Sequence, residues 1–140
     1  MRAKGRCFEL AAKHLLDDPS WTLVHGYAQL VAAFPFRMAH AWLEKGSRVY
    51  DPTRTEEPLM SLRRYRAKYR ACAERRYRAR EARKLLLTHE HFGPWDACIH
   101  DLIPLGLSLK QYRRALSTTL SVHSEKISCE NLRDAQRHAQ

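Results

Sequence analysis

Three residues in the first half of the chain have the side chains that build a thiol-based catalytic centre: Cys7, His40 and Asp51. A cysteine attacks as the thiolate, and a neighbouring histidine can take up its proton. A carboxylate beside that histidine fixes the ring tautomer and stabilises the imidazolium form. Together the three residue types indicate acyl transfer through a covalent thioester, provided that folding brings them into contact.

Cys7 stands at the beginning of a predicted helix over residues 7–16, where apolar side chains recur on one face. Unpaired backbone N–H groups and the positive end of the helix dipole at this position stabilise a thiolate. The alternative interpretation is a buried apolar thiol on a helix face. A catalytic role for Cys7 therefore requires a base nearby.

The base and its partner are predicted to lie on a hairpin formed by residues 38–44 and 47–51. With Lys45-Gly46 as its two-residue loop, His40 stands directly opposite Asp51. Directly opposed residues of an antiparallel pair point to the same face of the sheet. Taken singly, the two are an ordinary strand histidine and a turn aspartate, but their coincidence favours the triad. A helix N-terminus packed on the face that carries His40 would add Cys7.

These residues carry a family resemblance. A Cys that opens a helix, then HAWLE from His40, then DPT from Asp51 resembles the transglutaminase-like and papain-like core, over residues 5–53. The RCFE sequence around Cys7 is similar to the nucleophile motif of arylamine N-acetyltransferases. The later EAxxLLL and HFGPW elements resemble small uncharacterised phage and bacterial proteins. The hairpin is shorter than in the family, and no Trp follows the Cys. The resemblance implies Cys7 as nucleophile, His40 as base and Asp51 as orienter.

The predicted fold class is α+β, with an N-terminal helix packed on a small antiparallel sheet and a helical C-terminal half. Residues 1–121 would form a single transglutaminase-like domain, and residues 122–140 a polar helix or tail. The elements expected besides the hairpin are a strand over residues 21–31 with a possible bulge at Gly26, a helix or edge strand over 70–77, helices over 78–88 and 108–121, and a turn over 91–95.

Other residues are candidates for contacts with a ligand. His25, Tyr27, Trp42 and Trp95 are candidate substrate-binding residues, although ordinary packing explains such residues more often. A metal hypothesis rests on four potential zinc ligands within twelve residues: His89, His91, Cys98 and His100. Their spacing matches no standard zinc site, so no metal and no cofactor is expected.

The net charge of +10 and the pI of about 9.8 favour contact with polyanions or acidic partners. Four scattered cysteines without a CxxC pair indicate a reduced, cytoplasmic setting, and no apolar run approaches the ~18 residues of a membrane span.

The sequence thus predicts a cysteine amidase, deamidase or protease acting on a carboxamide or peptide bond, with an acidic protein as a possible substrate. The alternative is a non-enzymatic basic module that binds nucleic acid or an acidic protein partner, as an accessory or inhibitor protein. Its candidate nucleic-acid contacts are Arg63, Arg64, Arg66, Arg75 and Arg76.

Overall fold

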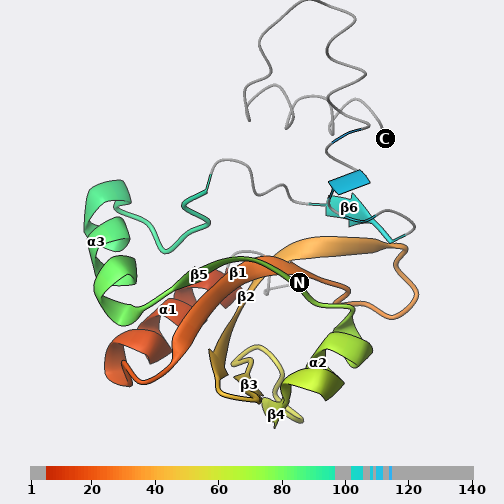
Figure 1. Ribbon diagram of the computed structural model, residues 1–140, viewed down its shortest axis with the longest axis horizontal. Coiled ribbons are helices and arrows are strands. Elements are labelled where there is room, and N and C mark those ends of the chain that lie inside the picture. Colours follow the sequence, from red (N-terminus) through yellow and green to blue (C-terminus); the bar gives the residue numbers. More distant parts are fainter. Residues whose placement is uncertain (1–5, 97–101, 106–107, 109, 112–113, 115–140) are drawn as a thin grey trace, which may run out of the picture.

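The computed structural model describes residues 6–96, 102–105, 108, 110–111 and 114, and the fold is α+β (Figure 1). An antiparallel sheet lies between helices on its two faces. The elements in chain order are α1 (Arg6–Asp17), β1 (Thr22–Ala28), β2 (Phe36–Lys45), β3 (Arg48–Tyr50), β4 (Leu59–Ser61), α2 (Leu62–Tyr69), β5 (Cys72–Tyr77), α3 (Ala79–His89) and β6 (Leu102–Pro104). The expected N-terminal helix on an antiparallel sheet is confirmed.

The sheet has the strand order β4-β3-β2-β1-β5, and β6 pairs with β2. On the side of β2 away from β1, β3 pairs with Leu43–Lys45 and β6 with Phe36–Met38. Within the described part of the chain, no strand pairs with residues 39–42 on that side. This gap in the sheet lies at the level of His40.

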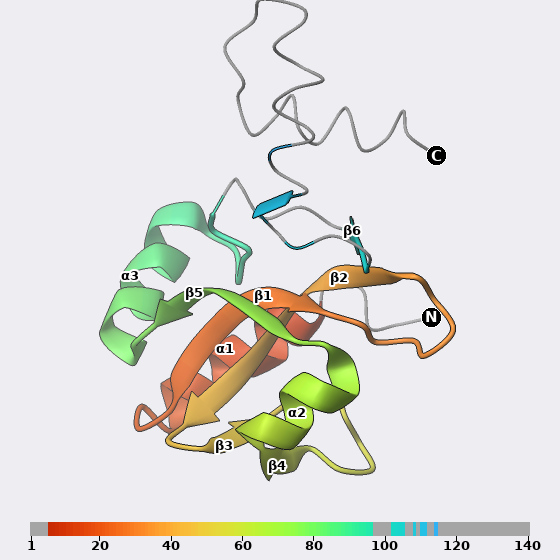
Figure 2. The same ribbon diagram turned by 45° about the vertical axis from the view of Figure 1, so that its right-hand side comes forward.

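α1 packs on the face of the sheet that carries Leu23, Ala41 and Leu43. Its buried residues follow helical spacing, so one stripe of the helix faces the sheet. α3 contributes Ala82 to the same hydrophobic cluster. Figure 2 shows α1 behind the sheet and α2 in front of it.

α2 covers the opposite face, where Tyr65 and Tyr69 pack with Val24 and Trp42. The two tyrosines are one helical turn apart, so they lie on the same side of the helix. The Ser61 side chain caps the helix by accepting a hydrogen bond from the backbone N–H of Arg64 at 3.2 Å.

The expected hairpin forms, but its loop is shifted by one residue, so each residue of β2 pairs with a partner two residues later than predicted. Lys45 pairs with Arg48 and Glu44 with Val49, so Gly46 and Ser47 form the loop. Gly46 has φ +58°, a left-handed conformation that glycine adopts without strain. β3 ends at Tyr50, and Asp51 therefore lies beyond the ladder, on the same face as His40 but not directly opposite it.

The predicted bulge beside Gly26 is present. The pairing of β1 with β5 shifts between His25 and Gly26, where His25 faces Arg75 but Gly26 faces Ala73. A Cβ atom on Gly26 would lie 2.1 Å from the carbonyl oxygen of Cys72, so no larger residue fits here. The ambiguous residues 70–77 contain the edge strand β5.

The remaining predictions concern the C-terminal half. α3 confirms the helix expected over residues 78–88. Most of the helix expected over 108–121, and all of residues 122–140, lie outside the described residues, so the helical C-terminal half stays a prediction. No helix in the described ranges is long and apolar enough to cross a membrane.

Candidate active site

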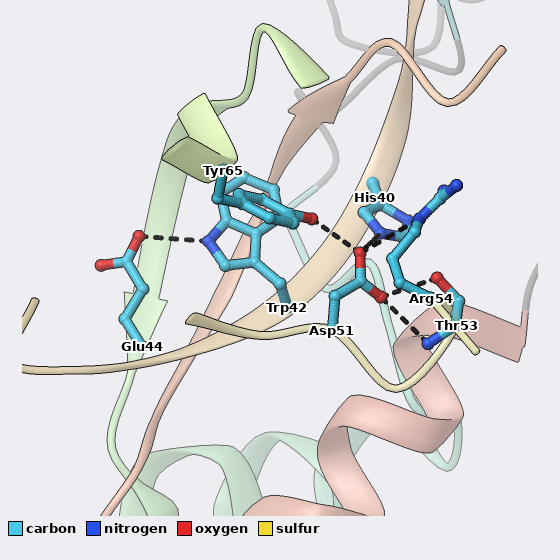
Figure 3. Close-up of polar contacts among 7 residues, drawn as sticks. All are labelled: His40, Trp42, Glu44, Asp51, Thr53, Arg54 and Tyr65. Atoms are coloured by element: carbon cyan, nitrogen blue, oxygen red, sulfur yellow. Dashed lines mark hydrogen bonds and ion pairs between the residues drawn. The ribbon is translucent and has the colours of Figure 1, made fainter. Parts of the chain in front are cut away.

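His40 and Asp51 form a buried hydrogen-bonded pair. The distance from His40 Nε2 to Asp51 Oδ2 is 2.7 Å, and the side chains of both residues are 1% exposed (Figure 3). Asp51 reaches this position because the chain turns directly after β3, with the Asp51 backbone N–H bonded to the carbonyl of Pro58. The predicted contact therefore exists, although it does not arise from the expected cross-strand pairing.

Both oxygens of the Asp51 carboxylate accept further hydrogen bonds. Oδ1 accepts from the backbone N–H of Thr53 at 3.0 Å and from its hydroxyl at 2.6 Å. Oδ2 accepts from the hydroxyl of Tyr65 at 2.7 Å, and Arg54 Nε lies 3.6 Å from the same oxygen. Burial acts to raise the pKa of Asp51, but the hydrogen bonds and charge of His40, with the bonds from Thr53 and Tyr65, hold it well below its ordinary value.

Cys7 is the second residue of α1 and is 4% exposed. α1 packs on the face that carries Ala41, whereas His40 alternates with Ala41 along β2. The expectation that α1 packs on the face of His40 is therefore wrong. Cys7 nevertheless comes close enough to the His40 imidazole to affect its protonation.

Cys7 influences the protonation of His40. Burial acts to lower the pKa of His40, but hydrogen bonding and charge from Asp51, together with those from Cys7, raise it to about 9. His40 Nε2 is hydrogen-bonded to Asp51, while Nδ1 is buried and has no conventional hydrogen-bond partner among the described residues. Nδ1 is therefore the ring nitrogen that is free to exchange a proton with the thiol.

His25 is buried in a different environment. Its ring lies 4.7 Å from that of Phe8, 4.9 Å from that of Tyr77 and 5.0 Å from that of Trp95, measured between centroids. Neither ring nitrogen has a hydrogen-bond partner among the described residues. Burial therefore lowers the pKa of His25 to about 3, against a weaker opposite influence of the Asp96 charge.

The other candidate substrate-binding residues also lie mostly inside the molecule. Tyr27 is 0% and Trp42 is 1% exposed, and Trp95 is partly buried. Trp42 donates a hydrogen bond from Nε1 to Glu44 Oε1 at 3.1 Å. In this conformation these residues are packing residues, and contact with a substrate would require the site to open.

The five candidate nucleic-acid contacts are all exposed: Arg63, Arg64, Arg66, Arg75 and Arg76. Three of them form ion pairs: Arg64 with Glu57, Arg75 with Asp96 at 2.7 Å and Arg76 with Glu44 at 3.3 Å. Arg76 also borders a hollow of about 230 Å³ at the loop end of the β2–β3 hairpin, which is lined by Ser20, Thr22, Glu44, Lys45, Gly46, Arg76 and Arg78. This hollow contains none of the triad residues.

The candidate metal ligands are only partly visible. The rings of His89 and His91 lie 5.7 Å apart at the end of α3, and Cys98 and His100 fall outside the described residues. His91 Nδ1 instead accepts a hydrogen bond from the backbone N–H of Gly93, and the His91 carbonyl accepts one from Trp95 Nε1. These bonds stabilise the turn that was expected over residues 91–95.

The sequence did not single out three residues that contact Asp51. Thr53 belongs to the DPT motif and was quoted only as part of it, and Arg54 follows it directly. Tyr65 lies 14 residues beyond Asp51 in the sequence, on α2. The spacing of Tyr65 and Tyr69 reveals an inward face of α2, but nothing local shows that this face meets Asp51.

No family model, curated protein or solved structure matches this chain. The resemblance to the transglutaminase-like core remains a prediction, and the site is interpreted from its own geometry.

Proposed function

We propose that the protein is a cysteine-nucleophile acyl-transfer enzyme of the amidase, deamidase or protease type. The observation that carries this proposal is the buried His40–Asp51 pair, 2.7 Å apart, with the influence of Cys7 on the same imidazole. A histidine that only packs in a core has no need of a carboxylate on one nitrogen and a thiol near the other. The free thiols of Cys7 and Cys72 fit a cytoplasmic setting, which forms part of the proposal.

The proposed reaction has two steps. In the first, the Cys7 sulfur bonds to the carbonyl carbon of a carboxamide or peptide, the C–N bond breaks, and His40 gives its proton to the leaving amine. In the second, His40 takes a proton from a water molecule that attacks the thioester, the C–S bond breaks, and the acid and the Cys7 thiolate are released. Asp51 keeps the imidazole oriented in both steps. Unpaired N–H groups at the start of α1 would stabilise the oxyanion.

The first experiment measures the rate at which iodoacetamide alkylates each cysteine between about pH 4 and 9, read by mass spectrometry. Cys72, which is partly buried in β5, serves as the internal reference. We expect Cys7 to react at about pH 6, where an ordinary thiol is almost fully protonated. The shape of the pH profile is compared, because the burial of Cys7 lowers its rate at every pH.

Two variants link the reactivity of Cys7 to its neighbours. His40→Ala and Asp51→Asn should slow the reaction of Cys7 at about pH 6 and leave that of Cys72 unchanged. If Cys7 follows the same pH profile as Cys72 and neither variant changes it, the enzyme proposal is wrong. Cys7→Ala should fold with little loss of stability, since a small buried side chain replaces another.

A specific observation favours a second candidate, a non-enzymatic module that binds polyanions. Residues 62–84 contain eleven Arg or Lys and two Glu, so this segment carries almost all of the net charge of +10. Tyr65, Tyr69 and Tyr77 are buried, so they are not available to stack on bases. The surface suits the phosphate backbone or an acidic protein rather than base recognition.

The two candidates respond to different substitutions. The binding module predicts that a short DNA or RNA duplex binds and that this binding weakens with salt. The binding should be unchanged in Cys7→Ala. It should disappear in the combined variant Arg63→Glu, Arg64→Glu, Arg75→Glu and Arg76→Glu. Binding that survives this charge reversal would rule out this surface as the contact.

A further inference from the structure

Tyr65 is the member of the Asp51 environment that comes from farthest along the chain. Its hydroxyl lies 2.7 Å from Asp51 Oδ2, which is the oxygen that also accepts from His40 Nε2 at 2.7 Å (Figure 3). Tyr65 is 0% exposed, so water does not compete for this bond. Burial and the Asp51 charge raise the pKa of Tyr65 well above its ordinary value, so the hydroxyl keeps its proton and remains a donor.

Two contacts fix the ring of Tyr65 in this position. It packs against Trp42, with ring centroids 5.5 Å apart, and against Tyr69, with ring centroids 5.0 Å apart. Trp42 is itself held through the hydrogen bond from Nε1 to Glu44 Oε1. The ring would fill the core without a hydroxyl, so the hydroxyl group serves the carboxylate rather than the packing.

We infer that Tyr65 is a positioning residue of the triad: its hydroxyl fixes the Asp51 oxygen that holds His40 and limits how strongly that oxygen binds the imidazolium. The catalytic part of this inference, that Tyr65 positions a triad, rests on the proposed function. A carboxylate oxygen that already accepts from Tyr65 has less negative charge to offer to His40. The proton on His40 is then held firmly enough to keep the imidazolium at neutral pH, but remains available to a leaving group.

The test compares Tyr65→Phe with the matched control Tyr69→Phe. Both substitutions remove one hydroxyl from a buried ring on the same face of α2, but of these two tyrosines it is Tyr65 that donates a hydrogen bond to Asp51. The readout is the titration midpoint of His40, followed by NMR of its labelled Cε1–H signal and assigned with His40→Gln. In Tyr65→Phe the midpoint should rise by about 0.5 to 1 pH unit, since one charged-acceptor hydrogen bond is lost.

Tyr69→Phe should leave the midpoint of His40 unchanged. An unchanged midpoint in Tyr65→Phe, or an equal rise in Tyr69→Phe, would overturn the inference. If Tyr65→Phe does not fold, the wild-type chain labelled with 3-fluorotyrosine replaces it. Fluorination makes the phenol a stronger donor, so the midpoint should then fall, and a rise or no change would contradict the assignment.

The result can be separated from the fate of the enzyme proposal. The alkylation profile of Cys7 decides whether the thiol is activated, and the NMR midpoint decides whether Tyr65 controls the Asp51–His40 bond. A shifted midpoint with an unreactive Cys7 would leave the inference standing and remove the enzyme. A reactive Cys7 with an unshifted His40 midpoint would support the enzyme proposal and remove the inference about Tyr65.

Discussion

His25 should make the protein lose stability in mild acid. Its ring is 0% exposed among Phe8, Tyr77 and Trp95, and neither nitrogen has a hydrogen-bond partner among the described residues. A proton on this ring would be a buried charge without compensation, and the pKa of His25 is accordingly lowered from 6.5 to about 3. In the unfolded chain water solvates the ring, which then takes up a proton at its ordinary pKa.

The sign and size of the effect follow from the two pKa values. Between pH 6.5 and about pH 3 the unfolded chain binds a proton at His25 and the folded protein does not, so stability falls as pH falls. The expected loss from this residue is about 2 kcal/mol between about pH 7 and pH 5. Below the folded pKa of about 3 this contribution no longer changes with pH.

The assay is denaturant unfolding followed by tryptophan fluorescence at several pH values for the wild type and for His25→Leu. The variant removes the titrating group, so the difference between the two free energies of unfolding should change by about 2 kcal/mol in favour of the variant from about pH 7 to pH 5. Leu23→Val, on the same face of β1, serves as the control. It should lower stability by a constant amount at both pH values, since no titrating group changes.

One result would refute the reasoning about His25. If the wild type and His25→Leu lose stability in parallel as the pH falls, the ring is not protonated selectively in the unfolded chain, and it must have a solvated or hydrogen-bonded position in the folded protein.

Three further predictions test other parts of the structure. In Asp51→Asn the pKa of His40 should fall from about 9 toward or below 6.5, because the effect of burial then prevails, and NMR titration would show this. The wild type gains stability from this histidine below pH 6.5 and loses it as the pH rises through about 9. This gain should shrink in the variant, as unfolding at about pH 6 and pH 10 would show. Gly26→Ala should destabilise the protein by about 1 to 3 kcal/mol, since the new Cβ would meet the Cys72 carbonyl oxygen, and an unchanged midpoint of thermal unfolding would contradict this contact. Ser61→Ala should cost about 1 kcal/mol through the lost cap of α2, whereas Ser61→Thr, measured in the same denaturation series, should retain most of it.

The sequence predicted those parts of the fold that depend on local patterns. The helix predicted over residues 7–16, the hairpin and the helix after residue 78 all follow from the spacing of apolar residues and from turn residues. The face of the hairpin was also right, since a shift of one residue in both strands leaves His40 and Asp51 on the same side. The register itself depends on whether Gly46 stands first or second in the loop, and the composition of the loop does not decide this.

The sequence could not predict how the three parts of the site meet. Cys7 on α1 influences His40 on β2, and among the described residues neither β3, which pairs with Leu43–Lys45, nor β6, which pairs with Phe36–Met38, covers the edge of β2 beside His40. Contacts of this kind join segments far apart in the chain. The same limit applies to Tyr65, whose bond to Asp51 depends on how α2 packs across the sheet.

The two buried histidines of the sheet show why burial alone does not identify a functional residue. His25 and His40 lie on neighbouring strands and are both almost fully buried, yet the pKa of one falls to about 3 and that of the other rises to about 9. Aromatic rings surround His25, so it remains neutral and can neither donate a proton nor pair with a thiolate. His40 has a carboxylate on one nitrogen and a thiol near the other, so its charged form is stabilised within the core. Of these two histidines, His40 is therefore the one that can hold a proton at neutral pH, and the proposed acyl transfer depends on it.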